Sequence, residues 1–149
     1  MTGVIIPTPN TTTWETYPAT SVLRPELLDP RFSCVYLTSS AREAERAAEL
    51  MEPEGIRLCH ANCLKDAEAW LRFSQSHVLL TDRTFSGGDW RDARDMTLRL
   101  SFRTTLVVAA RLADDKLWLE VLQGGAYDLV QKPFEADELR RSLENANGF

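Results

Sequence analysis

The fold is decided by one segment, Gly125-Ala126-Tyr127-Asp128-Leu129-Val130-Gln131-Lys132-Pro133-Phe134. Its apolar run, residues 127–130, has the length of a strand that is buried on both faces of a parallel sheet. Lys132-Pro133 follows that run directly, and an X-Pro bond in a tight turn tolerates the cis isomer. The segment therefore predicts a buried strand that ends in a shaped loop carrying a lysine.

Four more apolar runs of this kind precede the segment, at residues 34–37, 56–59, 78–80 and 106–109. Stretches with helical periodicity separate them, because apolar residues recur at intervals of three and four positions. Five strands that alternate with five helices predict an α/β fold in which helices cover both faces of a parallel sheet. In such sheets the functional crevice lies at the carboxyl ends of the strands.

Two of the expected helices carry features that bear on the site and the surface. Ser40 and Glu43 have the spacing of a capping box, which marks the start of the first helix. The fourth helix, residues 114–123, is apolar on more than one face. We expect Leu117, Trp118, Val121 and Leu122 to face inward and Leu119 to remain as a surplus apolar residue on the surface.

Composition excludes several classes of protein. A net charge of −5 argues against a nucleic-acid binder, which usually carries a basic face. Three cysteines are too few for a secreted disulfide scaffold, and no stretch is long and apolar enough to span a membrane. We therefore expect a cytoplasmic protein.

Residues 1–31 are rich in proline and threonine and predict an irregular arm, with Trp14 and Tyr17 as candidate anchors for docking. We expect residues 32–149 to form the domain.

The residues at the strand ends give the chain a specific likeness. Leu79-Leu80-Thr81-Asp82 closes the third apolar run, and the Gly-Ala and Lys-Pro-Phe elements flank the fifth. This pattern resembles the response-regulator receiver domains (the CheY-like family) over residues 32–149. The resemblance implies a flavodoxin-like, doubly wound five-stranded parallel sheet of order 2-1-3-4-5 flanked by five helices. It also implies a role in two-component (phosphorelay) signal transduction rather than as an enzyme.

By this resemblance, Asp82 is the expected phosphoacceptor and Lys132 the lysine that contacts the phosphoryl group. A carboxylate that attacks a phosphoryl donor needs nearby cations to neutralise the charge on the phosphoryl oxygens. The lysine supplies one cation, and a Mg²⁺ ion bound by carboxylate and carbonyl oxygens supplies the other. Asp82 and the carbonyl of Thr84 are the metal ligands that the resemblance implies here.

The chain departs from the family pattern at four positions. Thr38 and Ser39 stand where the family has the acidic pair that holds Mg²⁺, so we expect a weak or absent metal site. Ala109 replaces the hydroxyl residue at the end of the fourth strand. Leu129 replaces the aromatic switch residue on the fifth. Asp82 is therefore either a phosphoacceptor or a residual carboxylate paired with Lys132, in a phosphorylation-independent pseudo-receiver that acts as a protein-protein interaction module.

Three further features have alternative interpretations. The guanidinium of Arg83 or Arg111 could lie over Asp82 in the cation position, although an arginine that points to solvent is the more common outcome. Cys59, His60 and Cys63 could bind metal, although a cysteine in a buried strand is usually a small core residue. A small enzyme or a flavin-binding protein is a weaker alternative, because residues 38–42 contain no glycine to cradle a phosphate.

The partners that the resemblance implies are a sensor histidine kinase or a downstream protein. They would bind the face formed by the fourth helix, the fifth strand and the fifth helix, and a second copy of the chain is a further candidate. The sequence ends just after the fifth expected helix, so we expect a stand-alone receiver unit. No membrane and no nucleic-acid partner is expected.

Overall fold

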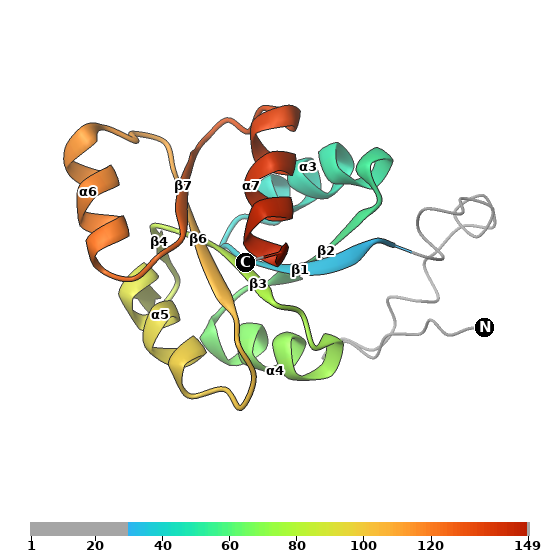
Figure 1. The fold of residues 1–149 in the computed structure, drawn as a ribbon, viewed down its shortest axis with the longest axis horizontal. Helices are drawn as coiled ribbons and strands as arrows, with labels where there is room; N and C mark the ends of the chain where they lie inside the picture. Colours follow the sequence, from blue (N-terminus) through green and yellow to red (C-terminus); the bar gives the residue numbers. More distant parts are fainter. Residues whose placement is uncertain (1–29, 149) are drawn as a thin grey trace.

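The computed structural model describes residues 30–148 and contains the expected α/β sandwich (Figure 1). Its sheet has the order β2-β1-β3-β6-β7, and every neighbouring pair is parallel. This order is the 2-1-3-4-5 arrangement of the main strands. The strands are β1 (Phe32–Leu37), β2 (Ile56–Ala61), β3 (Val78–Asp82), β6 (Thr105–Ala110) and β7 (Asp128–Gln131).

Helices cover both faces of the sheet, as Figure 1 shows. They are α3 (Ala41–Met51), α4 (Leu64–Ser74), α5 (Trp90–Leu98), α6 (Asp115–Gln123) and α7 (Ala136–Gly148), with a short 3₁₀ turn, η2 (Glu52–Glu54), after α3. One core packs α3 and α7 on the sheet, and the other packs α4, α5 and α6 on the opposite face. The predicted three-layer fold is confirmed.

The start of α3 differs from the predicted capping box. The Ser40 hydroxyl accepts a hydrogen bond from the Glu43 backbone N–H at 3.1 Å, as expected. The backbone N–H of Ser40, however, donates to the Thr38 hydroxyl and not to the Glu43 side chain. The Glu43 carboxylate is therefore available for contacts elsewhere. In the described part of the chain, a complete capping box is present at α5, between Asp89 and Asp92.

A small antiparallel hairpin, which the sequence pattern did not predict, lies between β3 and α5. Its strands are β4 (Thr84–Phe85) and β5 (Gly88–Asp89). Gly87 has a φ of 90°, in the left-handed region that favours glycine, so the pair Gly87-Gly88 forms the turn of this hairpin. The hairpin begins two residues after Asp82, so it directly follows the carboxyl end of β3.

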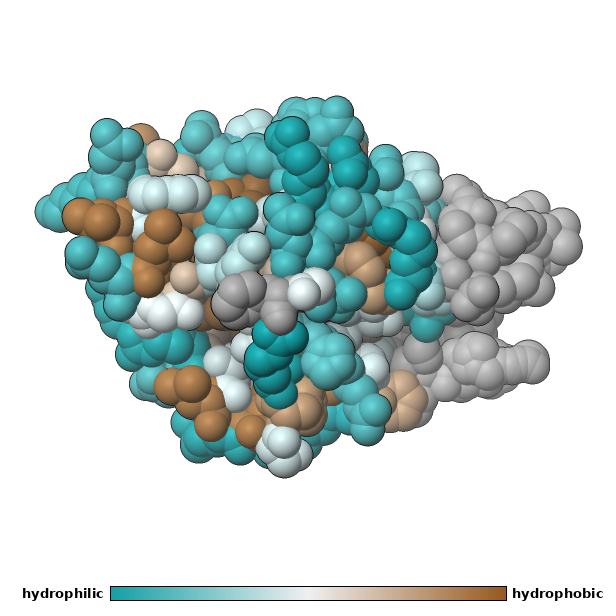
Figure 2. All heavy atoms as spheres, viewed as in Figure 1, coloured by the Kyte–Doolittle hydropathy of each residue, from teal (hydrophilic) through white to brown (hydrophobic). Residues whose placement is uncertain are grey.

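The surface of α6 corrects one prediction and confirms another. Leu117 and Val121 are buried, whereas Trp118 is 43% exposed and does not face inward as predicted. Leu119 is 55% exposed, in agreement with its predicted place on the surface. Hydrophobic atoms accordingly gather at the end of the molecule where α6 lies (Figure 2). This exposed apolar area is typical of a contact surface.

Two sequence predictions concern the start of the chain and membranes. The predicted arm, with Trp14 and Tyr17, falls almost entirely in residues 1–29, which lie outside the described residues. Within residues 30–148, no helix has both the length and the apolar character needed to cross a membrane.

Candidate functional site

The candidate site lies at the carboxyl ends of β1, β3, β6 and β7, where parallel strands meet at one edge of the sheet. Asp82 is the last residue of β3. Thr38 directly follows β1, and Lys132 directly follows β7. Lys132 is held there by a backbone hydrogen bond to Ala110, and the Lys132-Pro133 peptide bond is cis. The structure thus brings Asp82, Thr38 and Lys132 together, as the strand-end pattern predicted.

Both carboxylate oxygens of Asp82 accept hydrogen bonds. Oδ1 receives the Tyr36 hydroxyl at 2.6 Å and the Lys132 ammonium at 3.0 Å. Oδ2 receives the Thr38 hydroxyl at 2.6 Å. Asp82 is only 7% exposed, and a buried carboxylate needs such partners to offset the loss of water. Three of its roughly four acceptor directions are therefore in use.

Tyr36 is a site residue that sequence analysis missed. Its side chain is fully buried, and its ring packs edge-on against Phe134 at a centroid distance of 5.7 Å. Burial raises the pKa of its hydroxyl far above the usual range, and the neighbouring Asp82 charge and the hydrogen bond to it act in the same direction. The Tyr36 hydroxyl therefore keeps its proton at physiological pH and donates a hydrogen bond to Asp82. The signal was a phenol within an apolar strand, because a buried tyrosine usually has a partner for its O–H.

Glu43 is the second residue that was missed as part of the site. Its Oε1 accepts from the Lys132 ammonium at 2.6 Å, and its Oε2 accepts from the Arg111 guanidinium. Glu43 was assigned only a capping role, because its position at the third residue of a helix matches that motif. The ion pairs link α3, the loop after β6 and the loop after β7 around Asp82.

The alternative in which the guanidinium of Arg83 or Arg111 lies over Asp82 is not formed. The Arg111 guanidinium pairs with Glu43, and its side chain is 67% exposed. Among the ion pairs of residues 30–148, Asp82 has Lys132 as its partner, and Arg83 makes no ion pair. The ammonium of Lys132 already lies against Asp82, so the position beside this carboxylate is taken by a lysine rather than a guanidinium.

The other residues predicted for the site lie at its margin. Ser39 is exposed, and its hydroxyl accepts from the Ser86 backbone N–H at 2.7 Å, so it turns away from Asp82. Ala109 and Leu129 are buried in opposite faces of the sheet. Thr84 lines the wall of a pocket of about 340 Å³ above the strand ends. Its lining residues are Asp82, Arg83, Thr84, Ala109, Ala110, Arg111, Leu112 and Lys132.

The groups around Asp82 are suited to donating hydrogen bonds to it rather than to binding Mg²⁺. Mg²⁺ prefers carboxylate and carbonyl oxygens in a near-octahedral arrangement. The one side chain that replaces an acid beside Asp82 is Thr38, whose hydroxyl directs its proton at Oδ2. Two carboxylates, Asp82 and Glu43, meet two cations, Lys132 and Arg111, so the formal charges of this cluster balance without a metal.

Cys34, Cys59 and His60 belong to strands of the sheet, whereas Cys63 is the N-cap residue of α4. Cys59 is a buried free thiol, and burial raises its pKa to about 11, as is typical of a core cysteine. Within the described part of the chain, no cluster of three or more His, Cys, Asp or Glu side chains could hold a metal ion. A ring nitrogen of His60 lies 3.0 Å from the Thr38 carbonyl oxygen and helps to hold this loop.

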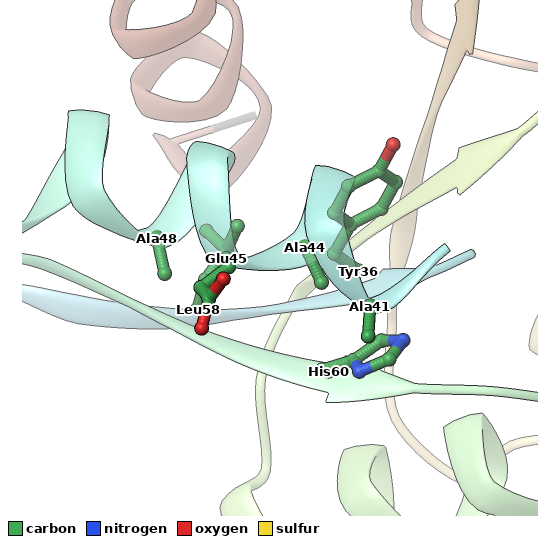
Figure 3. Close-up of a pocket in the computed structure, with 7 residues that line it drawn as sticks. All are labelled: Tyr36, Ala41, Ala44, Glu45, Ala48, Leu58 and His60. Atoms are coloured by element: carbon green, nitrogen blue, oxygen red, sulfur yellow. The ribbon is translucent and has the colours of Figure 1, made fainter. Parts of the chain in front are cut away.

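A second hollow of about 280 Å³ lies between α3 and β2 (Figure 3). Alanines on α3 leave this space, with Leu58 and His60 of β2 on the opposite side. The Tyr36 hydroxyl points away from this hollow. The ring of Tyr36 therefore separates the hollow from Asp82.

Comparison with solved structures identifies the fold. The receiver domain of the Francisella response regulator 1452 matches with a TM-score of 0.70 at 19% identity, covering 79% of this chain and 98% of that domain. The chemotaxis response regulator CheY4 of Vibrio cholerae matches with a TM-score of 0.68 at 15% identity, covering 77% of this chain and 98% of that protein. The beryllofluoride-activated NtrC4 receiver domain, solved as a dimer, matches with a TM-score of 0.69 at 18% identity, covering 78% of this chain and 96% of that domain.

Sequence comparison adds no closer relationship, since no protein-family profile and no curated protein matches the chain. At these low identities the structural likeness establishes the fold and not the activity. The chain therefore has the fold of response-regulator receiver domains, as the strand-end motifs predicted.

Proposed function

We propose that this chain is a signalling module of the receiver type that acts by contact with another protein, and that Mg²⁺-dependent phosphorylation of Asp82 does not set its state. One observation carries the proposal. Hydroxyl groups from Tyr36 and Thr38 donate to the two oxygens of Asp82, at 2.6 Å each, in addition to the Lys132 ammonium.

These hydrogen bonds oppose the chemistry of a phosphoacceptor. A nucleophilic carboxylate must direct a lone pair at phosphorus, and each donor on the carboxylate stabilises its charge and lowers its reactivity. At least one short hydrogen bond, to the Tyr36 or the Thr38 hydroxyl, would have to break before Oδ1 or Oδ2 could approach phosphorus in a favourable direction. The hydroxyls thus stabilise the unmodified form of the site.

The charge balance supports the same proposal. In the family pattern two acids and the acceptor aspartate face one lysine, which leaves two negative charges for Mg²⁺ to neutralise. Here Asp82 and Glu43 are matched by Lys132 and Arg111. A divalent cation would therefore add uncompensated positive charge to the cluster, and its electrostatic attraction to the site is lost.

The positions that transmit phosphorylation in the family are also changed. Ala109 has no hydroxyl to bond a phosphoryl group, and Leu129 has no ring to rotate. The exposed apolar side chains of α6, Trp118 and Leu119, are the area through which we expect the module to bind its partner protein. A state fixed by Tyr36, Thr38 and Lys132 would present this area without a phosphate signal.

The test is incubation with acetyl phosphate and millimolar Mg²⁺, followed by intact-mass measurement of the native chain and of Asp82→Asn. We expect no phosphoryl adduct on the native chain. A double variant, Tyr36→Phe with Thr38→Asp, removes one hydroxyl and restores one acid, and we expect it to gain an adduct that depends on both Asp82 and Mg²⁺. An adduct on the native chain with that same dependence would refute the proposal.

A phosphorelay role is the second candidate function. Its support is the ammonium of Lys132, 3.0 Å from Asp82, beside a pocket of about 340 Å³ that is large enough for a phosphoryl group. In this case a sensor histidine kinase would supply the phosphoryl group, and the hydroxyls of Tyr36 and Thr38 would have to rotate away. The same labelling experiment separates the two functions.

A further inference from the structure

We propose that the N-terminal segment of this chain docks on its own domain, with the side chain of Tyr17 in the hollow between α3 and β2. This goes beyond the proposed function, because it gives the hollow an occupant and gives a binding role to part of residues 1–29, which lie outside the described residues. Three features carry the proposal: the lining of the hollow, the place where the segment joins the domain, and the sequence of the segment.

The lining of the hollow is mostly apolar. Alanines of α3 lie opposite Leu58 of β2, so no large side chain of either element fills the space (Figure 3). The volume of about 280 Å³ lies just below the roughly 300–1,000 Å³ of small-molecule sites, so one or two side chains would fill it, rather than a helix. The lining residues are Tyr36, Ala41, Ala44, Glu45, Ala48, Leu58 and His60.

Glu45 is the one carboxylate of this lining. It is exposed, it reaches the hollow from α3, and within residues 30–148 it forms no ion pair (Figure 3). The other polar group, His60, already has a ring nitrogen 3.0 Å from the Thr38 carbonyl oxygen. A phenol or an indole would place its ring on the alanines and donate its O–H or N–H to the Glu45 carboxylate, an acceptor whose charge strengthens the hydrogen bond. The lining therefore suits an aromatic side chain that carries a donor.

The N-terminal segment joins the domain at the turn between α3 and β2. The backbone N–H of Arg31 donates to the Gly55 carbonyl at 2.7 Å, and its side-chain Nε donates to the Glu54 carbonyl at 3.0 Å. Gly55 directly precedes β2, and the hollow lies beside Leu58 and His60 of that strand. At about 3.3 Å per strand residue, the hollow begins about 10 Å from this junction. The two elements that bound the hollow are thus also those at which the segment ends.

The segment is long enough to reach the hollow. Tyr17 lies fourteen positions before Arg31. A chain of this length spans at most about 50 Å when extended, and roughly 20 Å on average as a random coil. Leu58 and His60 lie within both limits, at roughly 10–17 Å along β2 from the junction. A linkage of this length raises the local concentration of the ring to about the millimolar range, so a site of micromolar affinity would be mostly occupied.

The charges of the segment favour Tyr17 over Trp14 as the occupant. Residues 16–23, Thr-Tyr-Pro-Ala-Thr-Ser-Val-Leu, carry no charge. Trp14 is followed by Glu15, and docking of the indole would bring a second carboxylate close to Glu45. Tyr17 brings a hydroxyl donor to the same carboxylate without this repulsion.

The test is NMR of the full chain with carbon-13 in its alanine methyl groups. We expect nuclear Overhauser effects between the Tyr17 ring and the methyl groups of Ala44 and Ala48, and these effects should be lost in Tyr17→Ala. The methyl resonances should also move in this variant, because the ring current of the phenol is removed. Trp14→Ala is the matched control, and it should leave both the resonances and the Overhauser effects unchanged.

A second pair of variants tests the hollow from the side of the domain. Ala48→Leu, at a half-buried position of α3, fills the hollow and should abolish the Overhauser effects between Tyr17 and Ala44. Arg46→Leu, at an exposed position of the same helix outside the lining, should retain them. The proposal is overturned if the native chain shows no such effects, or if the methyl resonances respond to Trp14→Ala and not to Tyr17→Ala. Overhauser effects that cross between labelled and unlabelled copies in a mixed sample would assign the ring to a second copy and overturn it as well.

Discussion

Replacement of Tyr36 by phenylalanine removes one hydroxyl from the Asp82 cluster and leaves the ring in place. The variant keeps the edge-on packing against Phe134, so no cavity forms. What is lost is a 2.6 Å hydrogen bond to a buried carboxylate. Hydrogen bonds to charged groups contribute about 1.5–3 kcal/mol, and Asp82 retains Lys132 and Thr38 as donors, so we expect a loss of about 2 kcal/mol in the free energy of unfolding.

The pH dependence of this difference identifies its cause. Burial and the Asp82 charge raise the pKa of Tyr36 in the folded chain, whereas the pKa of a tyrosine in the unfolded chain is about 10. The stabilisation is therefore complete below pH ~10 and is lost as the pH rises above it, by about 1.4 kcal/mol per pH unit. The difference between the native chain and Tyr36→Phe should stay near 2 kcal/mol from pH 7 to 9 and close by about pH 11.5.

The assay is urea denaturation followed by circular dichroism at each pH. The buried thiols of Cys34 and Cys59, whose pKa values burial also raises, contribute equally to both chains and cancel in the difference. In an Asp82→Asn background the effect of Tyr36→Phe should fall to about 1 kcal/mol, because the acceptor is neutral. Equal stability at pH 7, or a difference that persists unchanged above pH 11, would refute the reasoning.

Three further predictions concern the site and the surface. Thr38→Asp should lower the free energy of unfolding by on the order of 2 kcal/mol without metal, because it places two carboxylates together. Added Mg²⁺ should raise the melting temperature of this variant and leave that of the native chain unchanged. A rise in the melting temperature of the native chain with Mg²⁺ would contradict this prediction. Glu43→Gln should cost about 1 kcal/mol in urea denaturation through loss of its ion pair with Lys132, and unchanged stability would mean that this pair contributes nothing. Trp118→Ala should change stability by less than about 0.5 kcal/mol, whereas Trp90→Ala, at a buried position, should cost about 3–5 kcal/mol; a large effect at Trp118 would place it in the core.

The fold was predictable because its determinants are local in the sequence. The short apolar runs correspond to the five strands within about two residues, and Asp82 and Lys132 follow from strand ends that must meet at one edge. The hairpin of β4 and β5 was missed because each of its strands has only two residues, too short for any periodicity. Trp118 was assigned to the core because hydrophobicity alone does not fix which face of an all-round apolar helix is buried.

The contacts within the site were less predictable, since they depend on side-chain direction. The sequence placed Thr38 and Ser39 as equivalents, but only Thr38 reaches Asp82, while Ser39 turns to Ser86. Glu43 matched a capping motif, and its real partners, Lys132 and Arg111, are far away in the chain. Long-range ion pairs leave no periodic signal, so the structure was needed to find them.

A crystal structure of the chain grown with millimolar Mg²⁺ and beryllium fluoride tests the central claim most directly, because it observes the oxygens of Asp82 under the conditions that favour a phosphorylated-like state. The account predicts the Tyr36 and Thr38 hydroxyls within hydrogen-bond distance of the two Asp82 oxygens, with no metal ion coordinated to this carboxylate. A Mg²⁺ ion coordinated by Asp82, with either hydroxyl displaced and beryllofluoride bound to the freed oxygen, would contradict it.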